Sequence, residues 1–274
     1  MTTARLAPRT ALFLPASNPR AIAKARTLDA DMVILDLEDA VRPDAKDAAR
    51  VGAVAAAGEG FGERLCAIRV NGADAPEHAA DIAAVAATAC DFVVVPKVER
   101  AEAARAVAAA CAKPVLAMIE TPAGVLAAAA IAAEPGVAGL IAGVNDLRAE
   151  LGIPAGAGRE GLSLALQTVV LAARAGGGWA IDGVYNAIED EAGLAAECRH
   201  GRMLGFDGKS LIHPNQIATA ADAFGPTAAE IEEAEALIAA ATGGAERFRG
   251  RMVEAMHVAQ ARALLARADG AKGG

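Results

Sequence analysis

The sequence predicts an α/β protein, a (β/α)₈ TIM barrel followed by a C-terminal helical extension. The chain has 274 residues, and a barrel of this kind needs about 250. Eight short apolar runs alternate with Ala-rich amphipathic stretches, which is typical of repeated βαβ units. The runs are continuously apolar, as expected for parallel strands that are buried on both faces.

The eight runs define the predicted strands, and the stretches between them define the helices. Eight units in one series fit a closed barrel better than an open sheet. Pro19 and Pro43 lie near helix starts, where the missing N–H of proline is harmless. The predicted strands are ALFLP (11–15), MVILDLE (32–38), LCAIRVN (65–71), FVVVPKV (92–98), VLAMIET (115–121), GLIAGVND (139–146), WAIDGVYN (179–186) and GKSLIHP (208–214).

The barrel is expected to span residues 1–225 and the extension residues 226–274. Two further helices are predicted in the extension, at about 227–242 and about 250–268, separated by a Thr-Gly-Gly turn. The Gly-rich segment GIPAGAGREG (152–161) follows the sixth strand. It has two interpretations, a mobile lid or an ordinary surface loop.

Composition excludes several classes of function. Lys plus Arg number 26 against 34 for Asp plus Glu, and aromatic residues make up 3% of the chain. An acidic chain with so few aromatic residues is a poor nucleic-acid binder. Apolar residues reach 54%, but no run approaches the roughly 18 residues of a membrane span. The N-terminus has no apolar targeting segment, so we expect a cytoplasmic protein without a membrane partner.

The cysteines are too scattered for a metal or disulfide motif. None of the four forms a CxxC pair, so a zinc knuckle and a disulfide framework are both unexpected. Each is interpreted as a small buried hydrophobe in a reducing compartment. The four are Cys66, Cys90, Cys111 and Cys198.

Polar residues close most of the predicted strands at one end only. Active sites of barrels lie at the C-terminal ends of the strands, so this distribution predicts an active site at that rim. A barrel with a purely structural role has no reason to place so much charge on one side. The strand-end residues are Asp36, Glu38, Asp39, Arg69, Asn71, Lys97, Glu120, Thr121, Asn145, Asp146, Asp182, Tyr185 and His213.

Several of these residues allow a second interpretation. Asp39 and Asp146 are equally suited to capping the next helix. Lys97 is a candidate for substrate contact, either as a Schiff-base amine in an apolar setting or, as we favour, as the partner of a strand-end carboxylate. His213 is interpreted as a rim histidine rather than a base. Tyr185 is a weak candidate for an acid.

Glu120 and Asp146 are the predicted metal ligands. They close the fifth and sixth strands, which are neighbours in a barrel, and two carboxylates with room for water suit Mg²⁺. Arg69 closes the third strand and is expected to face the same pocket. An arginine beside a divalent ion is a receptor for a small 2-oxo acid. The alternative for Arg69 is a structural ion pair with Glu38 or Asp36.

The same segments resemble the citrate lyase β-subunit-like branch of the HpcH/HpaI aldolase family. RTALFLPASNPRAIAKA is similar to the family's opening strand and helix. The resemblance covers nearly the whole chain, in the family's order and spacing. Its other motifs are ADMVILDLEDAV, RVNG, VVVPKVE, IETPAGV, GVNDL with the LG that follows, and AIDGVYN with GFDGKSLIHPNQI.

The resemblance implies Mg²⁺ at Glu120 and Asp146, and a grip by Arg69 on the carboxylate of the oxo acid. It places Glu38 and Asp39 beside the water ligands of the metal. It brings coenzyme A over the rim near residues 16–20, where Arg20 meets phosphate. It also implies homotrimers or hexamers, in which the extension packs on a neighbouring subunit.

One position departs from the family pattern. The extension reads RMVEAMHVAQA, so Glu254 stands where the family usually has aspartate. In the family that aspartate reaches the site of the neighbouring subunit and assists proton transfer. A glutamate keeps the charge but adds a methylene, and a shift of about 1 Å in a catalytic group costs around 100-fold in rate.

The expected function is therefore a Mg²⁺-dependent carbon–carbon lyase. Its substrate would be a 3-hydroxyacyl-CoA of the malyl-, citramalyl- or citryl-CoA type, cleaved to an acyl-CoA and a small 2-oxo acid. Three alternatives remain open. They are a malyl-CoA thioesterase, an aldolase that acts on free oxo acids without CoA, and a citrate lyase subunit that is inactive alone.

Overall fold

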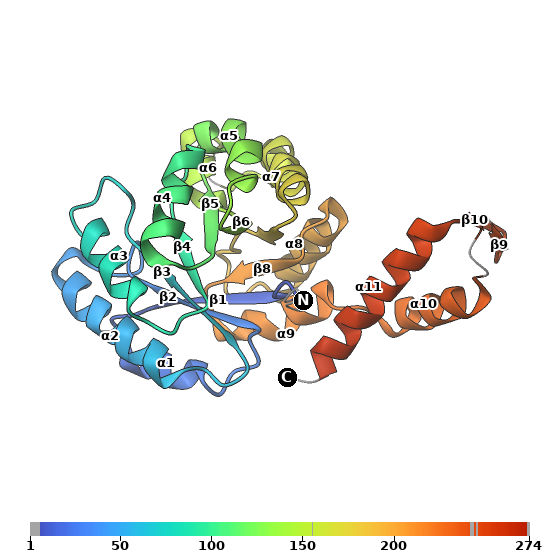
Figure 1. Ribbon diagram of the computed structural model, residues 1–274, viewed down its shortest axis with the longest axis horizontal. Coiled ribbons are helices and arrows are strands. Elements are labelled where there is room, and N and C mark those ends of the chain that lie inside the picture. The colour runs from blue at the N-terminus through green and yellow to red at the C-terminus, as the bar shows by residue number, and fades with distance from the viewer. Residues whose placement is uncertain (1–5, 155, 242–243, 245, 273–274) are drawn as a thin grey trace.

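The computed structural model describes residues 6–154, 156–241, 244 and 246–272. Eight parallel strands pair in chain order and close into a barrel (Figure 1), which confirms the predicted fold class. Each strand overlaps the run predicted for it, and most strands end a few residues before the end of that run. The strands are β1 (Thr10–Pro15), β2 (Met32–Asp36), β3 (Leu65–Arg69), β4 (Phe92–Val95), β5 (Val115–Ile119), β6 (Val137–Ala142), β7 (Trp179–Asp182) and β8 (Gly208–Leu211).

The two faces of the strands belong to two separate apolar cores. In β2, Met32 and Ile34 join the smaller core, and Val33 and Leu35 join the larger one. Because side chains alternate along a strand, the smaller core fills the barrel and the larger one lies under the helices. The same alternation turns Asp36 inward, above the apolar filling of the barrel.

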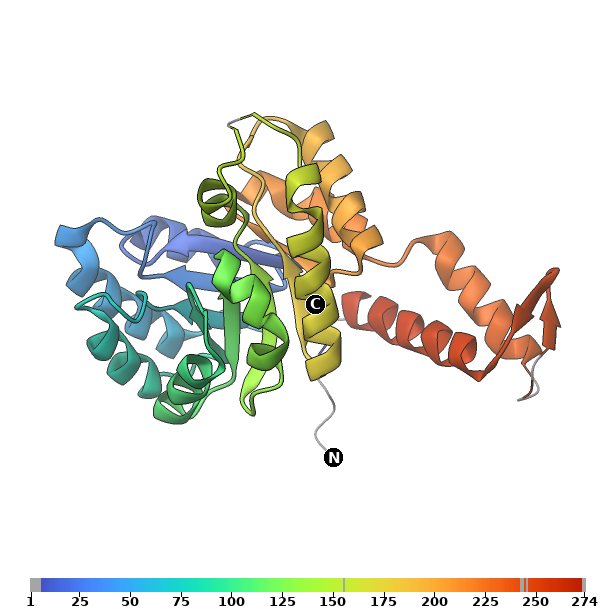
Figure 2. The ribbon, with the colours of Figure 1, turned by 90° about the horizontal axis from the view of Figure 1, so that it is seen from above.

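Helices cover the outside of the barrel (Figures 1 and 2). Asn18 caps α1 and Thr121 caps α5, each accepting a backbone N–H, and a proline follows each cap. Pro43 opens a short 3₁₀ helix (Pro43–Ala45) that leads into α2. The helices are α1 (Pro19–Ala25), α2 (Lys46–Glu59), α3 (His78–Ala86), α4 (Ala101–Cys111), α5 (Pro122–Ala132), α6 (Val144–Glu150), α7 (Ser163–Gly176), α8 (Glu191–Leu204) and α9 (Ile217–Phe224).

The C-terminal segment forms an arm that projects from the barrel (Figure 2). Helices α10 (Ala228–Ala240) and α11 (Ala255–Lys272) pack against each other, and a hairpin of β9 (Glu246–Phe248) and β10 (Arg251–Val253) joins them at the tip. The prediction of a helix from about residue 250 is therefore wrong at its start.

The hairpin has a local cause. Arg249 and Gly250 both adopt positive φ angles, 45° and 82°, and two such residues in succession form the turn that joins tight hairpins. Met252 and Val253 consequently lie on a strand, within the range that was predicted as a helix.

Two expectations about composition can be compared with the structure. In the described part of the chain, no helix is both long enough and apolar enough to cross a membrane. All four cysteines are buried as free thiols, as predicted for small apolar side chains.

Candidate active site

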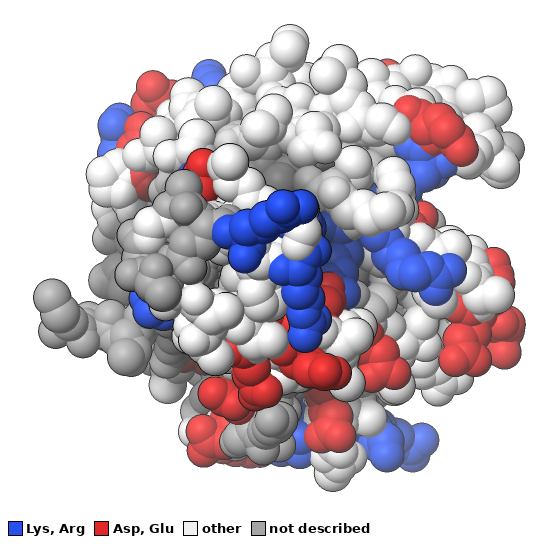
Figure 3. Space-filling view, turned by 90° about the vertical axis from the view of Figure 1, so that its right-hand side faces the viewer, with Lys and Arg blue, Asp and Glu red and all other residues white. Residues whose placement is uncertain are grey.

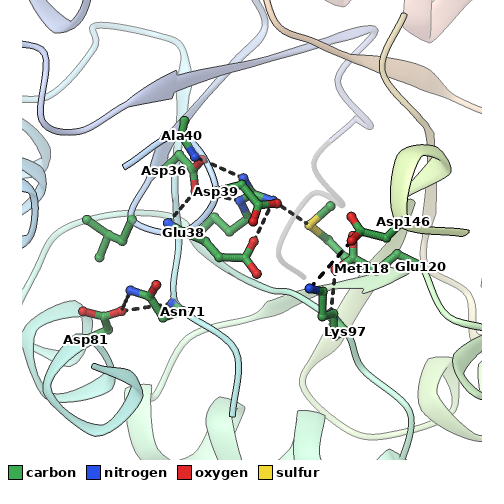
Figure 4. Close-up of polar contacts among 12 residues, drawn as sticks. Asp36, Glu38, Asp39, Ala40, Asn71, Asp81, Lys97, Met118, Glu120 and Asp146 are labelled. Atoms are coloured by element: carbon green, nitrogen blue, oxygen red, sulfur yellow. Dashed lines mark hydrogen bonds and ion pairs between the residues drawn. The ribbon is translucent and has the colours of Figure 1, made fainter. Parts of the chain in front are cut away.

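The polar strand ends surround a cavity at one mouth of the barrel. Its volume is about 330 Å³, and Asp36, Asp39, Arg69, Glu120 and Asp146 are among the residues that line it. Figure 4 shows Asp36 and Asp39 on one side of the barrel mouth and Glu120 and Asp146 on the other. The sequence prediction that separate strands bring these residues together agrees with this geometry.

A buried ion pair between Asp36 and Arg69 is the most fully bonded part of the cavity wall. Arg69 Nε donates to Asp36 Oδ1 at 2.7 Å, and Nη2 donates to Oδ2 at 2.6 Å. The same carboxylate accepts the backbone N–H groups of Glu38 and Ala40. Both oxygens of Asp36 are therefore occupied, so this residue holds the arginine instead of offering a ligand.

One nitrogen of Arg69 remains directed at the acidic side chains of the mouth. Arg69 Nη1 lies 2.8 Å from Glu38 Oε2 and 3.5 Å from Asp39 Oδ2. The guanidinium stacks over the ring of Phe13 at 5.0 Å, which fixes its plane. Arg69 thus forms the structural ion pair with Asp36 that was the alternative interpretation of this residue. Its Nη1 atom still faces the cavity. Its fork is shared, because Asp36 takes the other two nitrogens.

Glu38 is a buried carboxylate with incomplete compensation. Its Oε2 atom is buried and makes no hydrogen bond, although it lies within ion-pair distance of Arg69. Burial raises the pKa of Glu38 to about 7, against the opposing pull of Arg69. Asp39, the next residue, is largely exposed. The two predicted neighbours of the metal site therefore differ strongly in environment.

Glu120 is a deeply buried acid that faces the cavity. Its side chain is 2% exposed, and Oε1 accepts the backbone N–H of Lys97 at 2.7 Å. Burial raises its pKa to about 7, and the Lys97 hydrogen bond opposes the rise. Gly143 is required beside it, because a Cβ at that position would overlap the Glu120 side chain.

Asp146 faces Glu120 from the neighbouring strand–helix unit. Strands β5 and β6 pair directly, as predicted, and Asp146 lies in the first turn of α6. Neither acid caps a helix: Thr121 caps α5, and the N-cap residue of α6 is Gly143, which makes no side-chain cap. Both carboxylates therefore remain available for chemistry.

Lys97 is the cation nearest to this pair of acids. Its Nζ lies 3.7 Å from Asp146 Oδ1, which is the ion pair favoured from the sequence. Burial alone would lower the pKa of Lys97, but the surrounding carboxylates, Asp146 first, raise it. The amine therefore stays protonated and is unsuited to Schiff-base formation.

The donor set around the cavity fits Mg²⁺. Mg²⁺ prefers oxygen ligands and is usually held by one or two carboxylates together with several waters. Glu120 supplies a buried carboxylate whose negative charge is poorly compensated, and Asp146 supplies a partly exposed one. Among the described residues, no cluster of three or more His, Cys, Asp or Glu side chains is arranged for a metal. Water and substrate would therefore complete the coordination.

Four predicted site residues, Glu38, Lys97, Arg20 and Glu254, are not among those that line the cavity. Glu38 and Lys97 pair with two residues that do line it, Arg69 and Asp146. Arg20 is exposed in the first turn of α1. Glu254 is exposed between β10 and α11, where its backbone N–H donates to His257 Nδ1 at 3.0 Å. Figure 1 places this junction at the outer end of the arm, on the side of the molecule that faces the viewer in Figure 3.

Three of the other strand-end residues have structural partners. Asp182 ends β7 but turns outward to meet Lys209, so the interpretation of Asp182 as a residue of the site is wrong. Tyr185 donates its hydroxyl to Asp190 at 2.6 Å. His213 accepts the backbone N–H of Asn215, in agreement with its interpretation as a rim histidine.

The Gly-rich loop after α6 is fastened on both sides. Arg148 donates to the carbonyl oxygens of Ala157 and Gly158, and Arg159 pairs with the buried carboxylate of Asp182. These contacts favour the surface-loop interpretation over the mobile lid for its described residues.

Sequence reasoning missed Lys46, whose ammonium group contacts the loop that carries Glu38. It also missed Lys209, a lysine that is 0% exposed within an apolar strand. A charged residue inside a buried run is itself a signal, because a buried charge needs a partner. Lys46 carries no such signal, since it occupies an ordinary position at a helix start.

Comparison with protein families identifies related sequences. The family model described as HpcH/HpaI aldolase/citrate lyase matches residues 9–214, and a second, described as a C–C bond lyase of the TIM-barrel fold, matches residues 162–270. A (3S)-malyl-CoA thioesterase of Cereibacter sphaeroides is 44% identical over 269 residues, which cover 95% of this chain and 94% of the relative. A citrate lyase subunit beta-like protein of Mycobacterium tuberculosis is 36% identical over 264 residues, covering 94% of each chain.

Solved structures that resemble this chain include relatives of the same kind. Protein CitE of Mycobacterium tuberculosis, in complex with magnesium, acetoacetate and coenzyme A, superimposes with a TM-score of 0.83 at 34% identity, covering 97% of this chain and 100% of that one. A citrate lyase beta subunit of the same organism, complexed with oxaloacetate and magnesium, has a TM-score of 0.73 at 37% identity. That match covers 80% of this chain and 98% of the other.

Proposed function

The chain belongs to the HpcH/HpaI aldolase/citrate lyase family, and we propose that it is a Mg²⁺-dependent carbon–carbon lyase acting on a malyl-CoA-type thioester. The observation that carries the proposal is a pair of carboxylates that cap no helix, Glu120 and Asp146, beside Arg69 in one cavity. Two related structures hold magnesium together with a small oxo acid, which supports the same pairing of ligands here.

Glu120 and Asp146 would hold the ion in this proposal. When bound, Mg²⁺ supplies Lewis-acid stabilisation of negative charge on the reacting oxygen of the substrate. Their positions just after adjacent strands also leave one side open to substrate, because Asp146 is 38% exposed at the side chain.

Arg69 would bind the substrate carboxylate through Nη1. The arginine cannot rotate away, because Asp36 fixes Nε and Nη2. The price of this rigidity is that Arg69 offers a single nitrogen rather than the full fork. Glu38 is the candidate to hold or move a proton beside it, since its pKa of about 7 allows both protonation states near neutral pH.

The reaction follows from this arrangement. A base takes the proton of the C3 hydroxyl group, and the bond between C2 and C3 breaks. The C3 oxygen becomes the carbonyl of the released 2-oxo acid, and the electron pair of the broken bond forms the enolate of the remaining thioester. Protonation of that enolate at carbon gives the acyl-CoA product.

Thioester hydrolysis is the second candidate function. The malyl-CoA thioesterases of Cereibacter sphaeroides are 44% identical to this chain, against 32% for the citrate lyase subunit beta of Leuconostoc mesenteroides. The same cavity would serve this reaction, with water attacking the thioester carbonyl and free CoA leaving.

A product assay separates the two candidates. Purified protein is given malyl-, citramalyl- and 3-methylmalyl-CoA with Mg²⁺, and acyl-CoA, oxo acid and free CoA are measured separately. The lyase forms acyl-CoA and oxo acid in equal amounts. Free CoA without oxo acid would establish hydrolysis instead, and the absence of any product would refute both candidates.

The arm is the proposed contact with other subunits. We propose a homotrimer or hexamer in which Glu254 enters the site of an adjacent subunit, where it assists proton transfer. Its exposed position at the outer end of a projecting arm supports this proposal. Glu254→Ala would then cut turnover by roughly 10²-fold, with little change in Mg²⁺ binding.

Subunit exchange tests the shared site. Two inactive variants, Glu254→Ala and Asp146→Asn, are mixed until their subunits exchange. Some hybrid interfaces then combine an intact metal site with an intact Glu254, so activity returns. No recovery in a preparation shown to have exchanged would contradict the sharing.

Two further parts of the proposal concern CoA and location. Arg20, exposed at the start of α1, is the proposed contact for a CoA phosphate group. The buried free thiols fit the reducing cytoplasm that we propose for this protein.

A further inference from the structure

We infer that Lys46 is a positioning residue that sets the backbone of the Glu38 loop, residues 37–42 between β2 and α2. This inference rests on the proposed function, because it assigns Lys46 to the support of Glu38 and Asp39. Lys46 itself does not line the cavity. It therefore acts through the loop and not on the substrate.

The ammonium group of Lys46 donates three hydrogen bonds to the Glu38 loop and to the neighbouring Asn71. It donates to the carbonyl oxygen of Leu37, the carbonyl oxygen of Glu38 and the side-chain oxygen of Asn71, each at 2.7 Å. A lysine ammonium has three N–H donors and no acceptor, so this group is fully satisfied by the loop and its support. Lys46 is the first residue of α2, which anchors its stem on the helix.

Two of these acceptors determine the orientation of Glu38. The carbonyls of Leu37 and Glu38 belong to the peptide units on either side of the Glu38 Cα. The N–H of Glu38 is held separately by Asp36 Oδ1 at 2.8 Å. With both flanking peptide units fixed, the φ and ψ angles of Glu38 are fixed too, and its carboxylate is directed at Arg69.

The third acceptor connects Lys46 to a buried support. Asn71 donates its backbone N–H and its side-chain amide to Asp81 Oδ2, at 3.0 and 2.7 Å. Asp81 is 0% exposed, and its other oxygen accepts Arg50 Nε at 2.6 Å. Figure 4 shows the Asn71–Asp81 contact on the side of Glu38 away from Glu120. The support therefore runs from α2 through α3 to the end of β3, and Lys46 joins it to the Glu38 loop.

Lys113 provides a matched control. Its Nζ donates to two backbone carbonyls, those of Thr88 and Cys90, at 2.8 and 3.2 Å, and it is half-buried like Lys46. These contacts lie at the opposite end of the barrel, where strands begin. Lys113→Met therefore removes a similar backbone anchor without touching the Glu38 loop.

The experiment compares Lys46→Met, Lys46→Arg and Lys113→Met with the parent protein. Amide hydrogen exchange of residues 37–42 and steady-state turnover are measured on each. Lys46→Met should speed exchange of the Glu38 loop and lower kcat by about 10- to 100-fold, the cost of displacing a catalytic group by about 1 Å. KM for the CoA thioester should change by less than about threefold, because the substitution leaves the binding surface untouched. Lys46→Arg, which keeps a charged donor, should recover part of kcat, and Lys113→Met should leave kcat and loop exchange unchanged.

Three outcomes would overturn the inference. These are unchanged loop exchange in Lys46→Met, unchanged kcat in a variant whose loop exchanges faster, or an equal fall in kcat for Lys113→Met. If Lys46→Met does not fold, Lys46→Arg carries the comparison, and it must then show faster loop exchange and a lower kcat than Lys113→Met. A parent protein without turnover would refute the proposed function alone. The positioning claim would then be decided by loop exchange and by the Mg²⁺ affinity of Lys46→Met relative to Lys113→Met.

Discussion

Two charge clusters, one buried and one partly exposed, lie near the same end of the barrel, and they differ in charge balance. The wall cluster consists of Lys209, Asp182, Glu197 and Arg159, with two cations and two carboxylates. The mouth cluster has five carboxylates against two cations, Arg69 and Lys97, an excess of three negative charges when all are ionised. Its carboxylates are Asp36, Glu38, Asp39, Glu120 and Asp146.

Hydrogen bonding is also more complete in the wall cluster than in the mouth cluster. Lys209 is fully buried and donates to Asp182, to the Gly183 carbonyl and to Glu197. In the mouth cluster, a buried oxygen of Glu38 makes no hydrogen bond, and the pKa values of Glu38 and Glu120 both rise to about 7. A balanced buried cluster is structural, whereas an acidic excess beside a cavity is suited to a cation.

The largest expected effect is on turnover, from removal of one charge in the mouth cluster. Glu120→Gln keeps the shape but removes the proposed metal ligand, so turnover should fall by at least about 10³-fold, the scale of a lost electrostatic stabiliser. The thermal midpoint should stay the same or rise, because a poorly compensated buried charge disappears. Steady-state kinetics and calorimetric melting measure the two effects. A Glu120→Gln enzyme with parental turnover would refute the assignment.

Removal of one charge from the wall cluster should have the opposite pattern. Lys209→Met removes the cation of Glu197 and leaves Asp182 with Arg159 alone, and such a loss costs about 3–5 kcal/mol of unfolding free energy. Urea unfolding measures it, while kcat per folded molecule should remain that of the parent. A Lys209→Met variant with normal stability and lost activity would contradict the structural role of the wall cluster.

A smaller effect is expected from Arg69→Lys, which keeps the charge of the mouth cluster. Lysine cannot pair with Asp36 through two nitrogens and also reach the cavity. Affinity for pyruvate or glyoxylate should fall by about 10- to 100-fold, equivalent to one charged hydrogen bond. Affinity for acetyl-CoA should be unaffected. Equilibrium titration with each ligand is the measurement, and unchanged oxo-acid affinity would exclude the proposed role of Arg69.

The smallest expected effect is a pH dependence of the metal-free protein. The pKa of Glu120 is about 7 in the folded state against an ordinary value of 4.5, so the folded state binds more protons between these values. The free energy of unfolding should therefore fall as pH rises from about 4.5 to about 7 and then level off.

Glu120→Gln is the control for this pH dependence. Its melting temperature in EDTA should fall less over that window, and the remaining slope should include the contribution of Glu38. Mg²⁺ competes with the proton on Glu120, so its affinity for the parent should rise up to about pH 7. An identical slope in parent and variant would contradict the cause assigned to it.

The sequence predicted the barrel and the location of its site because both depend on local patterns. Continuous apolar runs mark strands buried on two faces, and the polar residue after each run falls at the rim. Glu120, Asp146 and Arg69 follow from this rule alone. The resemblance to a family added the identity of the metal and the substrate class.

What the sequence could not predict depends on side-chain direction and on tertiary contacts. Asp182 and Glu120 both close an apolar run, yet Asp182 faces the helices and Glu120 faces the cavity. Because side chains alternate along a strand, a shift of one residue in the strand end decides which of the two faces the side chain occupies. The Arg249–Gly250 turn was missed because its positive φ angles are not typical of arginine. The role of Lys46 depends on Asn71, which lies 25 residues away along the chain.

The most direct test of the account is a metal titration of both clusters. Mn²⁺ is added to the parent, to Glu120→Gln and Asp146→Asn in the mouth cluster, and to Glu197→Gln in the wall cluster. The free ion is followed by electron paramagnetic resonance, and Mg²⁺ is used as competitor. We expect one Mg²⁺-competable site in the parent and in Glu197→Gln, and at least about 100-fold weaker binding in both mouth variants. Parental affinity in Glu120→Gln or Asp146→Asn, or loss of the site in Glu197→Gln, would contradict the account.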